Sequence, residues 1–186
     1  MLISESHLKI VTERNIHLVR WPNNPDHLDS VVRGAAQTLS YHLAELRGEQ
    51  LSTERDVLLE LATKFDFPKY AGPGHEEMNW NSANDSLGDL EWILKGTSDS
   101  GERPDAPAMR GVVAVLRNPE HLLKADPIQF AFLVDALGRQ SRRLLKLWIP
   151  FHVVIGPLPE DYRYECFMNI LSASSYFCEA CQMVDG

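Results

Sequence analysis

The feature that most constrains the fold is an uninterrupted apolar run at residues 111–116, Gly-Val-Val-Ala-Val-Leu. The run has the length of a β-strand and carries no polar side chain that could face water. A strand of this kind is typical of the centre of a parallel sheet, where helices cover both faces. We therefore expect an α/β fold.

Helical patterns separate this run from the other segments that have strand character. Strands are predicted at 16–21, 41–46, 111–116 and 151–155, and helices at 26–39, 52–67, from residue 79 onward, and at 128–148. Asp26 and Ser52 are the expected N-caps of the first two helices. Because strands joined by crossover helices pair in parallel, the order predicts a small, mainly parallel sheet with helices packed around it.

The chain divides into an N-terminal extension at 1–39, a central domain at 40–157 and a C-terminal extension at 158–186. The last part is predicted to contain a helix at 162–183, because its apolar residues recur at three- and four-residue steps. Those residues are Phe167, Ile170, Leu171, Phe177, Cys178 and Cys181. A lone helix of this length is marginal in water, so the stripe is expected to pack on the sheet or against a second copy.

Acidic residues gather between His75 and Asp105, where eight acids accompany two bases and supply most of the chain's net charge of −8. On a helix, Asn81, Asp85 and Asp89 lie four residues apart and share one face. Such a surface repels phosphate groups, so nucleic acid and anionic membranes are not expected as ligands. A basic partner is favoured.

Motifs for other chemistry are incomplete. The adjacent residues His75, Glu76 and Glu77 could ligate a metal, but no further ligand follows at a suitable spacing. The Cys178-x-x-Cys181 pair is better explained by buried thiols than by redox chemistry. No nucleophile motif or phosphate-binding loop occurs, and we expect no metal and no cofactor. The N-terminal residues lack an apolar signal core and only three cysteines are present, so a cytoplasmic location is expected.

Three motifs together resemble the barstar family of ribonuclease inhibitors. They are Phe-Pro-Lys-Tyr-Ala-Gly at 67–72, Asn-Trp-Asn-Ser-Ala-Asn-Asp-Ser-Leu at 79–87 and Asp-Leu-Glu-Trp at 89–92. The resemblance extends over roughly residues 40–156 and implies three core strands in a parallel sheet, to which residues 16–21 could add an N-terminal strand. It also implies an inhibitor whose loop and following helix cover a ribonuclease active site.

Carried over to this chain, the resemblance nominates a partner-binding surface with no catalytic residues. The acids and amides of the same stretch extend it, and the full set is Tyr70, Gly72, Glu76, Glu77, Asn79, Asn81, Asn84, Asp85 and Asp89. Two positions depart from the family pattern: Asn81 stands where aspartate is usual, and Asn84 stands where the founding inhibitor has an aromatic residue. Residues 73–78 are an insertion.

The function expected from this resemblance is that of an intracellular inhibitor of a basic ribonuclease or ribonuclease-like toxin, acting as an immunity protein and existing as a monomer or weak homodimer. Two alternatives stay open. One is a barstar-like scaffold that binds a different protein. The other is a small metal-assisted hydrolase that uses His75, Glu76 and Glu77.

Overall fold

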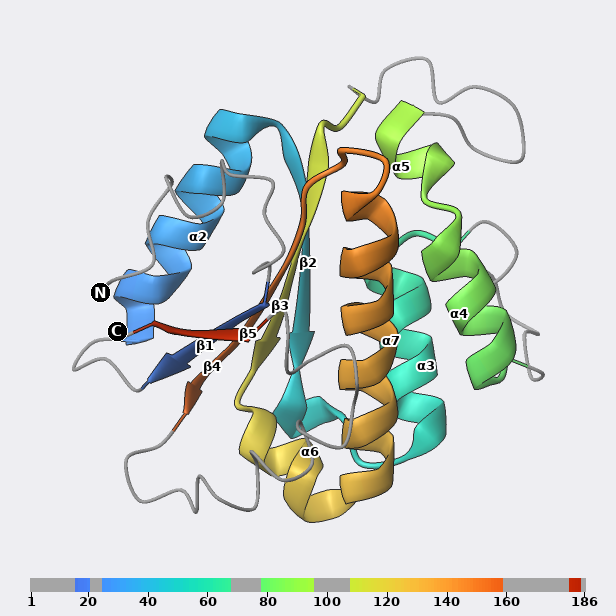
Figure 1. The fold of residues 1–186 in the computed structure, drawn as a ribbon. Helices are drawn as coiled ribbons and strands as arrows, with labels where there is room; N and C mark the ends of the chain where they lie inside the picture. The colour runs from blue at the N-terminus through green and yellow to red at the C-terminus, as the bar shows by residue number, and fades with distance from the viewer. Residues whose placement is uncertain (1–15, 21–24, 68–77, 96–107, 159–180, 185–186) are drawn as a thin grey trace.

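The computed structural model of the chain describes residues 16–20, 25–67, 78–95, 108–158 and 181–184 (Figure 1). In chain order they form β1 (Ile16–Arg20), α2 (Pro25–Leu39), β2 (Tyr41–Arg47), the 3₁₀ turn η1 (Gly48–Gln50), α3 (Glu54–Lys64), α4 (Trp80–Gly88), α5 (Glu91–Lys95), β3 (Gly111–Arg117), α6 (Pro119–Ala125), α7 (Pro127–Leu145), β4 (Phe151–Leu158) and β5 (Cys181–Val184).

The described strands form one parallel sheet in the order β2-β3-β4-β1-β5. The predicted apolar run is β3, which pairs with β2 on one side and β4 on the other. β1 lies between β4 and β5, with Ile16 opposite Val153 on one side and opposite Cys181 on the other. The first and last described strands of the chain are therefore neighbours.

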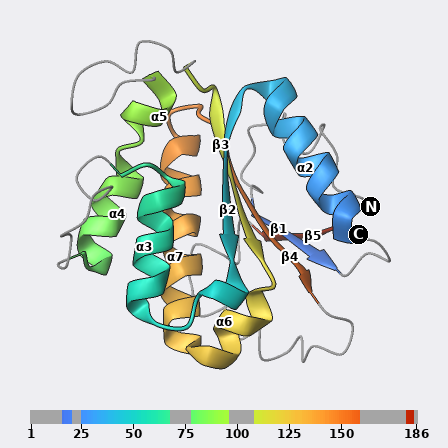
Figure 2. The ribbon, with the colours of Figure 1, turned by 180° about the vertical axis from the view of Figure 1, so that it is seen from behind.

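Helices cover both faces of the sheet, with α2 on one face and α3, α4, α5 and α7 on the other (Figures 1 and 2). The side chains of β3 alternate between the two layers. Val113 and Val115 pack with Val32 and Ala36 of α2. Val112, Ala114 and Leu116 join a larger core beneath α3 and α7. The largest members of that core are Phe65, Phe67, Phe130 and Phe151. The two buried faces explain why the run is apolar throughout.

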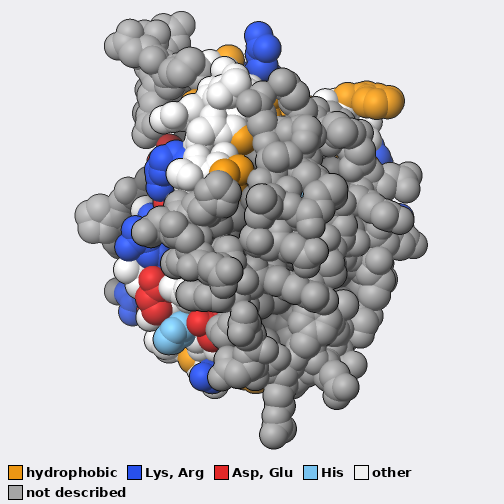
Figure 3. Space-filling model, turned by 90° about the vertical axis from the view of Figure 1, so that its left-hand side faces the viewer, with side chains coloured by type: hydrophobic (Ala, Val, Ile, Leu, Met, Phe, Trp, Pro, Cys, Tyr) orange, Lys and Arg blue, Asp and Glu red, His pale blue; other side chains and the backbone are white. Residues whose placement is uncertain are grey.

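The face that α2 covers is the one seen in Figure 3, where described acidic and basic side chains are interspersed along one margin. Three charged residues form a bridged cluster: Glu45 accepts hydrogen bonds from Arg33 at 2.8 Å and from Arg117 at 2.9 Å. The cluster ties α2 to the ends of β2 and β3. Within the described ranges, no helix is both long enough and apolar enough to span a membrane.

The four predicted strands and the α/β fold class are confirmed, but the end of the chain differs from the prediction. Cys181–Val184 is a strand, whereas a helix was predicted through residue 183. Pairing with β1 supplies the backbone hydrogen bonds of this short strand, and such long-range pairing leaves no local signal in the sequence. Residues 162–180 of the predicted helix lie outside the described residues, and the three-part division of the chain stays a prediction.

The predicted helix caps were misplaced. Thr53, not Ser52, is the N-cap of α3: its Oγ1 accepts a hydrogen bond from the backbone N–H of Asp56 at 3.2 Å. The Asp56 carboxylate accepts one in return from the backbone N–H of Thr53 at 2.9 Å. Counting from Ser52 had placed Arg55 at the third helical position, whereas counting from Thr53 places Asp56 there and completes a capping box. Helix α2 begins at Pro25, so Asp26 lies inside it.

The long helix predicted at 128–148 is shorter, and one of its residues faces the other way. Helix α7 ends at Leu145, and the separate helix α6 precedes it. Leu133, Ala136 and Leu137 are buried as predicted. Phe132 was expected inside, but 47% of its surface is exposed. Its ring lies toward α4, which covers only part of it.

Candidate protein-binding surface

Helix α4 carries most of the described candidate residues, and its first turn is fixed by Asn79. The Asn79 Oδ1 accepts a hydrogen bond from the backbone N–H of Ser82 at 3.0 Å, and the Ser82 Oγ accepts one from the backbone N–H of Asn79 at 3.1 Å. The two residues form a capping box. Asn79 is exposed, but its side-chain oxygen is committed to starting the helix.

One side of α4 is held against the core and α7. Ala83 and Leu87 are fully buried. Gly88 is buried as well, and a Cβ at this position would lie 2.2 Å from the Arg143 Nη1. The guanidinium of Arg143 therefore rests directly on the end of α4. The buried side fixes the rotation of the helix and so decides which residues face outward.

The outward side carries Asn81, Asp85 and Asp89, which are all exposed. Asn81 and Asp85 lie one helical turn apart on the same face. Asp89 follows as the C-cap, and its backbone N–H donates to the carbonyl oxygens of Asp85 and Ser86 at 3.1 Å. The structure therefore leaves all three predicted residues exposed, two of them on one face of α4 and the third at its C-terminal end.

Asn84 lies apart from this group, at the seam between α4 and α7. Its side chain is half-buried, and Gln140 Nε2 donates to its backbone oxygen at 3.4 Å. The Asn84 Oδ1 is buried and finds no donor among the described residues. Asn84 is thus placed to affect the contact between the two helices as well as any partner at the edge of the surface.

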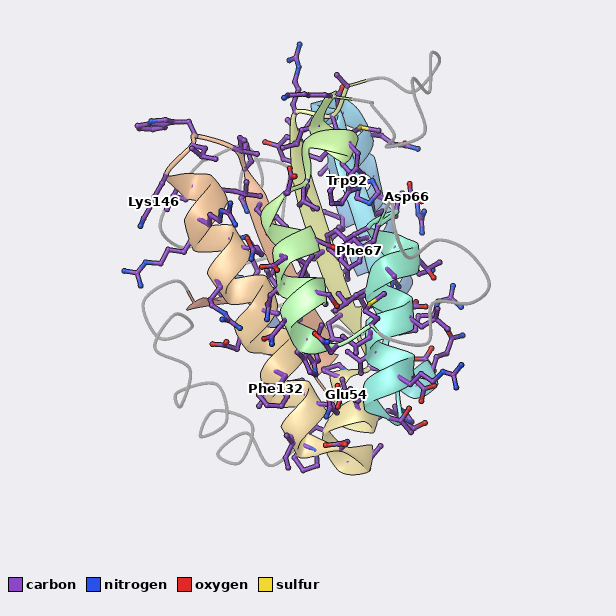
Figure 4. The ribbon with its side chains drawn as sticks, turned by 90° about the vertical axis from the view of Figure 1, so that its right-hand side faces the viewer. Glu54, Asp66, Phe67, Trp92, Phe132 and Lys146 are labelled. Carbon is purple, nitrogen blue, oxygen red and sulfur yellow. The ribbon has the colours of Figure 1, made fainter. Side chains whose placement is uncertain are left out.

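A half-exposed aromatic pair adjoins the start of α4, and the sequence analysis missed it. The Trp80 Nε1 donates to Gln129 Oε1 of α7 at 2.7 Å, and the Trp80 ring lies 5.7 Å from the ring of Phe132. Figure 4 shows Phe132 on the side of α7 toward α4. The 3.6-residue pattern of α7 predicted that Phe132 is buried. A helix that faces two neighbours has a wider apolar side, so an apolar residue on that side is not always in the core.

Four predicted site residues, Tyr70, Gly72, Glu76 and Glu77, lie outside the described residues. So does His75 of the alternative metal site. The described chain stops at Phe67, directly before this loop, and resumes at Met78. In the ranges that the structure describes, no three His, Cys, Asp or Glu side chains gather in a way that could hold a metal ion.

The parallel sheet and the exposed polar face of α4 are the features of a small α/β binding protein. The family model described as Barstar (barnase inhibitor) matches residues 41–156, well over half of the chain, and the chain belongs to this family. A comparison with curated proteins finds no match. The match starts at β2 and ends in β4, so β1 and β5 lie outside the matched residues.

Family membership confirms the predicted resemblance and the barstar-like fold. Barstar proteins are inhibitors of ribonucleases, and theirs is not a family of enzymes. Helix α4 lies within the matched residues, and so do all nine predicted site residues.

Proposed function

We propose that this protein inhibits a basic ribonuclease or ribonuclease-like toxin by covering its active-site cleft with the outward face of α4 and the loop that precedes it. The observation that carries the proposal is the exposed row of Asn81, Asp85 and Asp89 on a helix whose buried side is fixed against the core. We place this activity in the cytoplasm, where an immunity protein meets a toxin made by the same cell or a neighbouring one.

Charge supports this choice of partner. The described residues of α4 and its C-cap contain two carboxylates, on Asp85 and Asp89, and no lysine or arginine. A ribonuclease that binds RNA has a basic cleft, so the two surfaces attract each other during encounter. Carboxylates placed in that cleft occupy positions where substrate phosphates bind.

The aromatic pair of Trp80 and Phe132 supplies the apolar contact surface that carboxylates lack. Exposed aromatic surface beside a charged row allows water to be excluded from the contact, and buried contacts of this kind determine the dissociation rate. Asn81 replaces one carboxylate of the usual family pattern. Asp85 is therefore expected to be the central charge of the interface.

The experiment is a ribonuclease inhibition assay with matched charge variants. The nucleases are barnase, named by the family description, and any small basic nuclease encoded beside this gene. Asp85→Asn is expected to raise the inhibition constant by about 30-fold, because truncation of a central interface charge commonly costs about 2 kcal/mol or more.

Glu54→Gln is the matched control, because Glu54 is an exposed acid that belongs to α3 and not to α4. It makes the same change of net charge and is expected to change the inhibition constant less than about twofold. Equal losses in both variants would mean that only net charge matters and would refute the assignment to α4. Failure of the unmodified protein to bind either nuclease would refute the proposed function.

A further inference from the structure

The turn after α7 contains a tryptophan in a backbone conformation that disfavours it. Trp148 has φ 59°, in the left-handed region. The other described non-glycine residues with positive φ are Ser40, Asp66 and Asn118. Those three are short and polar, whereas a bulky residue in this region is an outlier. Such strain persists only where the surrounding structure enforces it.

The hydrogen bonds of the turn show what enforces the conformation. Trp148 N–H donates to the Leu145 oxygen at 2.9 Å, and Ile149 N–H donates to the Leu144 oxygen at 3.0 Å. Together these two bonds form a Schellman motif, whose left-handed position is normally a glycine. The fold of this turn therefore favours glycine at position 148.

The tryptophan side chain does not stabilise the fold in compensation. Of its surface 80% is exposed, and the preceding Leu147 is 61% exposed. Among the large hydrophobic residues of the described chain, Trp148 is the most exposed, and Leu147 ranks third after Ile128, at 64%. Trp148 is therefore held in solvent by a hydrogen-bonded turn, at a conformational cost, and the residue before it is aliphatic. Tryptophan is one of the residue types enriched at interface hot spots.

The surroundings of this apolar pair are basic. Residues 136–150 contain four bases and no acid; Arg139 pairs with Asp135 at 2.9 Å, and Arg143 lies on the end of α4. Arg142 is exposed in the last turn of α7, and Lys146 is exposed at its C-cap. Arg110, which precedes β3 at the same end of the sheet, is exposed as well. This cationic surface stands out in a chain whose net charge is −8.

From these observations we propose that Leu147 and Trp148, with Arg142 and Lys146, form a second binding surface, which takes an acidic protein segment containing an apolar side chain. Figure 4 shows Lys146 and Phe132 toward opposite ends of α7, and a separation of 14 positions along a helix spans about 20 Å. The surface is therefore separate from the aromatic pair beside α4. Its partner has the opposite charge to a basic nuclease, so the proposal does not depend on the proposed function.

Charge and shape favour this occupant over others. A symmetric contact with a second copy would place the same lysine and arginines against each other. The net charge of −8 repels extended polyanions such as a membrane surface or a nucleic acid strand. A short acidic segment avoids most of that repulsion, and its apolar residue fits the Leu147–Trp148 pair.

The test is a selection of random 12-residue peptides displayed on phage against the full chain, followed by fluorescence anisotropy with the selected peptides. Enriched peptides are expected to combine aspartate or glutamate with an aromatic or aliphatic residue. Trp148→Gly is expected to weaken their binding at least tenfold while leaving the urea midpoint equal or higher, because glycine suits the left-handed position. Lys146→Glu is expected to weaken binding as well.

Leu59→Ala is the matched control, because Leu59 is an exposed aliphatic residue on α3, at 58%. This variant is expected to bind the selected peptides as tightly as the unmodified chain. The proposal is overturned if the enriched peptides are not acidic, if Trp148→Gly binds them as tightly as the unmodified chain, or if its urea midpoint falls. It is also overturned if a 20-residue oligothymidine, vesicles with 30% phosphatidylserine or a second copy of the chain binds through Trp148 instead.

Discussion

Replacement of Phe67 by alanine tests how the core supports the loop that was predicted to carry Tyr70. Phe67 is fully buried and is the last described residue before that loop. Asp66, with φ 48°, turns the chain at the end of α3, and Phe67 N–H then donates to the Ala62 oxygen at 2.9 Å. The Phe67 ring meets Trp92 edge-on and lies beside Phe65, with centroid distances of 6.2 Å in both cases (Figure 4).

The expected cost follows from these contacts. Replacement of a buried phenylalanine by alanine destabilises a protein by about 3–5 kcal/mol. Two aromatic contacts disappear as well, each worth about 0.5–1.5 kcal/mol beyond the buried area. We therefore expect a loss of free energy of unfolding near the top of that range, about 4–5 kcal/mol. With a urea m-value of about 2 kcal/mol/M, the unfolding midpoint should fall by about 2 M.

The assay is urea unfolding followed by circular dichroism, with Phe132→Ala as the matched control. Phe132 is 47% exposed, so the same substitution there is expected to cost less than about 2 kcal/mol. Phe67→Leu keeps most of the buried volume and should cost about 1.5 kcal/mol or less. A Phe67→Ala midpoint within about 0.5 M of the unmodified protein would refute the view that this ring supports the end of α3.

Three further predictions concern the caps, the charged cluster and the sheet edge. Hydrogen bonds from the side chains of Ser52 and Thr53 lower the pKa of Asp56, so its contribution to stability is present above the ordinary carboxyl pKa and is lost as the pH falls through the lowered value. Asp56→Asn should therefore flatten the acid limb of a stability–pH curve measured in urea, and an unchanged limb would contradict the capping role. Burial disfavours the charged form of Arg117 and lowers its pKa, and Glu45→Ala removes a carboxylate that accepts a hydrogen bond from it. The variant should therefore lose about 1–3 kcal/mol of unfolding free energy at low salt, measured by thermal unfolding. No loss would mean that the cluster is only a surface feature. Deletion of residues 181–186 should expose the edge of β1 and speed amide hydrogen exchange at Ile16–Arg20, and unchanged protection there would show that β5 does not stabilise its neighbour.

The sequence predicted the central strands well because their burial leaves a local signal. Nothing polar interrupts residues 111–116, and two buried layers are the only environment that such a strand tolerates. The same reasoning failed at Cys181–Val184, where the strand depends on pairing with a partner 165 residues away. Local spacing carries no information about that partner.

The candidate surface was predictable where helix geometry alone decides exposure. Asn81 and Asp85 face outward because Ala83 and Leu87 occupy the buried side, and both facts follow from spacing. Phe132 could not be placed in this way, because its exposure depends on how far α4 extends over α7. Trp148 left no signal either, because its exposure and backbone conformation arise from the turn that joins α7 to β4.

The position of β1 between β4 and β5 has a consequence for synthesis of the chain. Ile16 leaves the ribosome early, but one of its two partner strands starts at Cys181. At about 5–20 residues per second, the intervening 165 or so residues take roughly 8–33 s to be made. The last central strand, β4, ends at Leu158, so β2, β3 and β4 are able to assemble and to pair with β1 roughly 1–5 s before Cys181 is made. Between the synthesis of β4 and that of β5 the nascent chain presents an open sheet edge at β1, which is a site for mispairing with other chains and for chaperone binding.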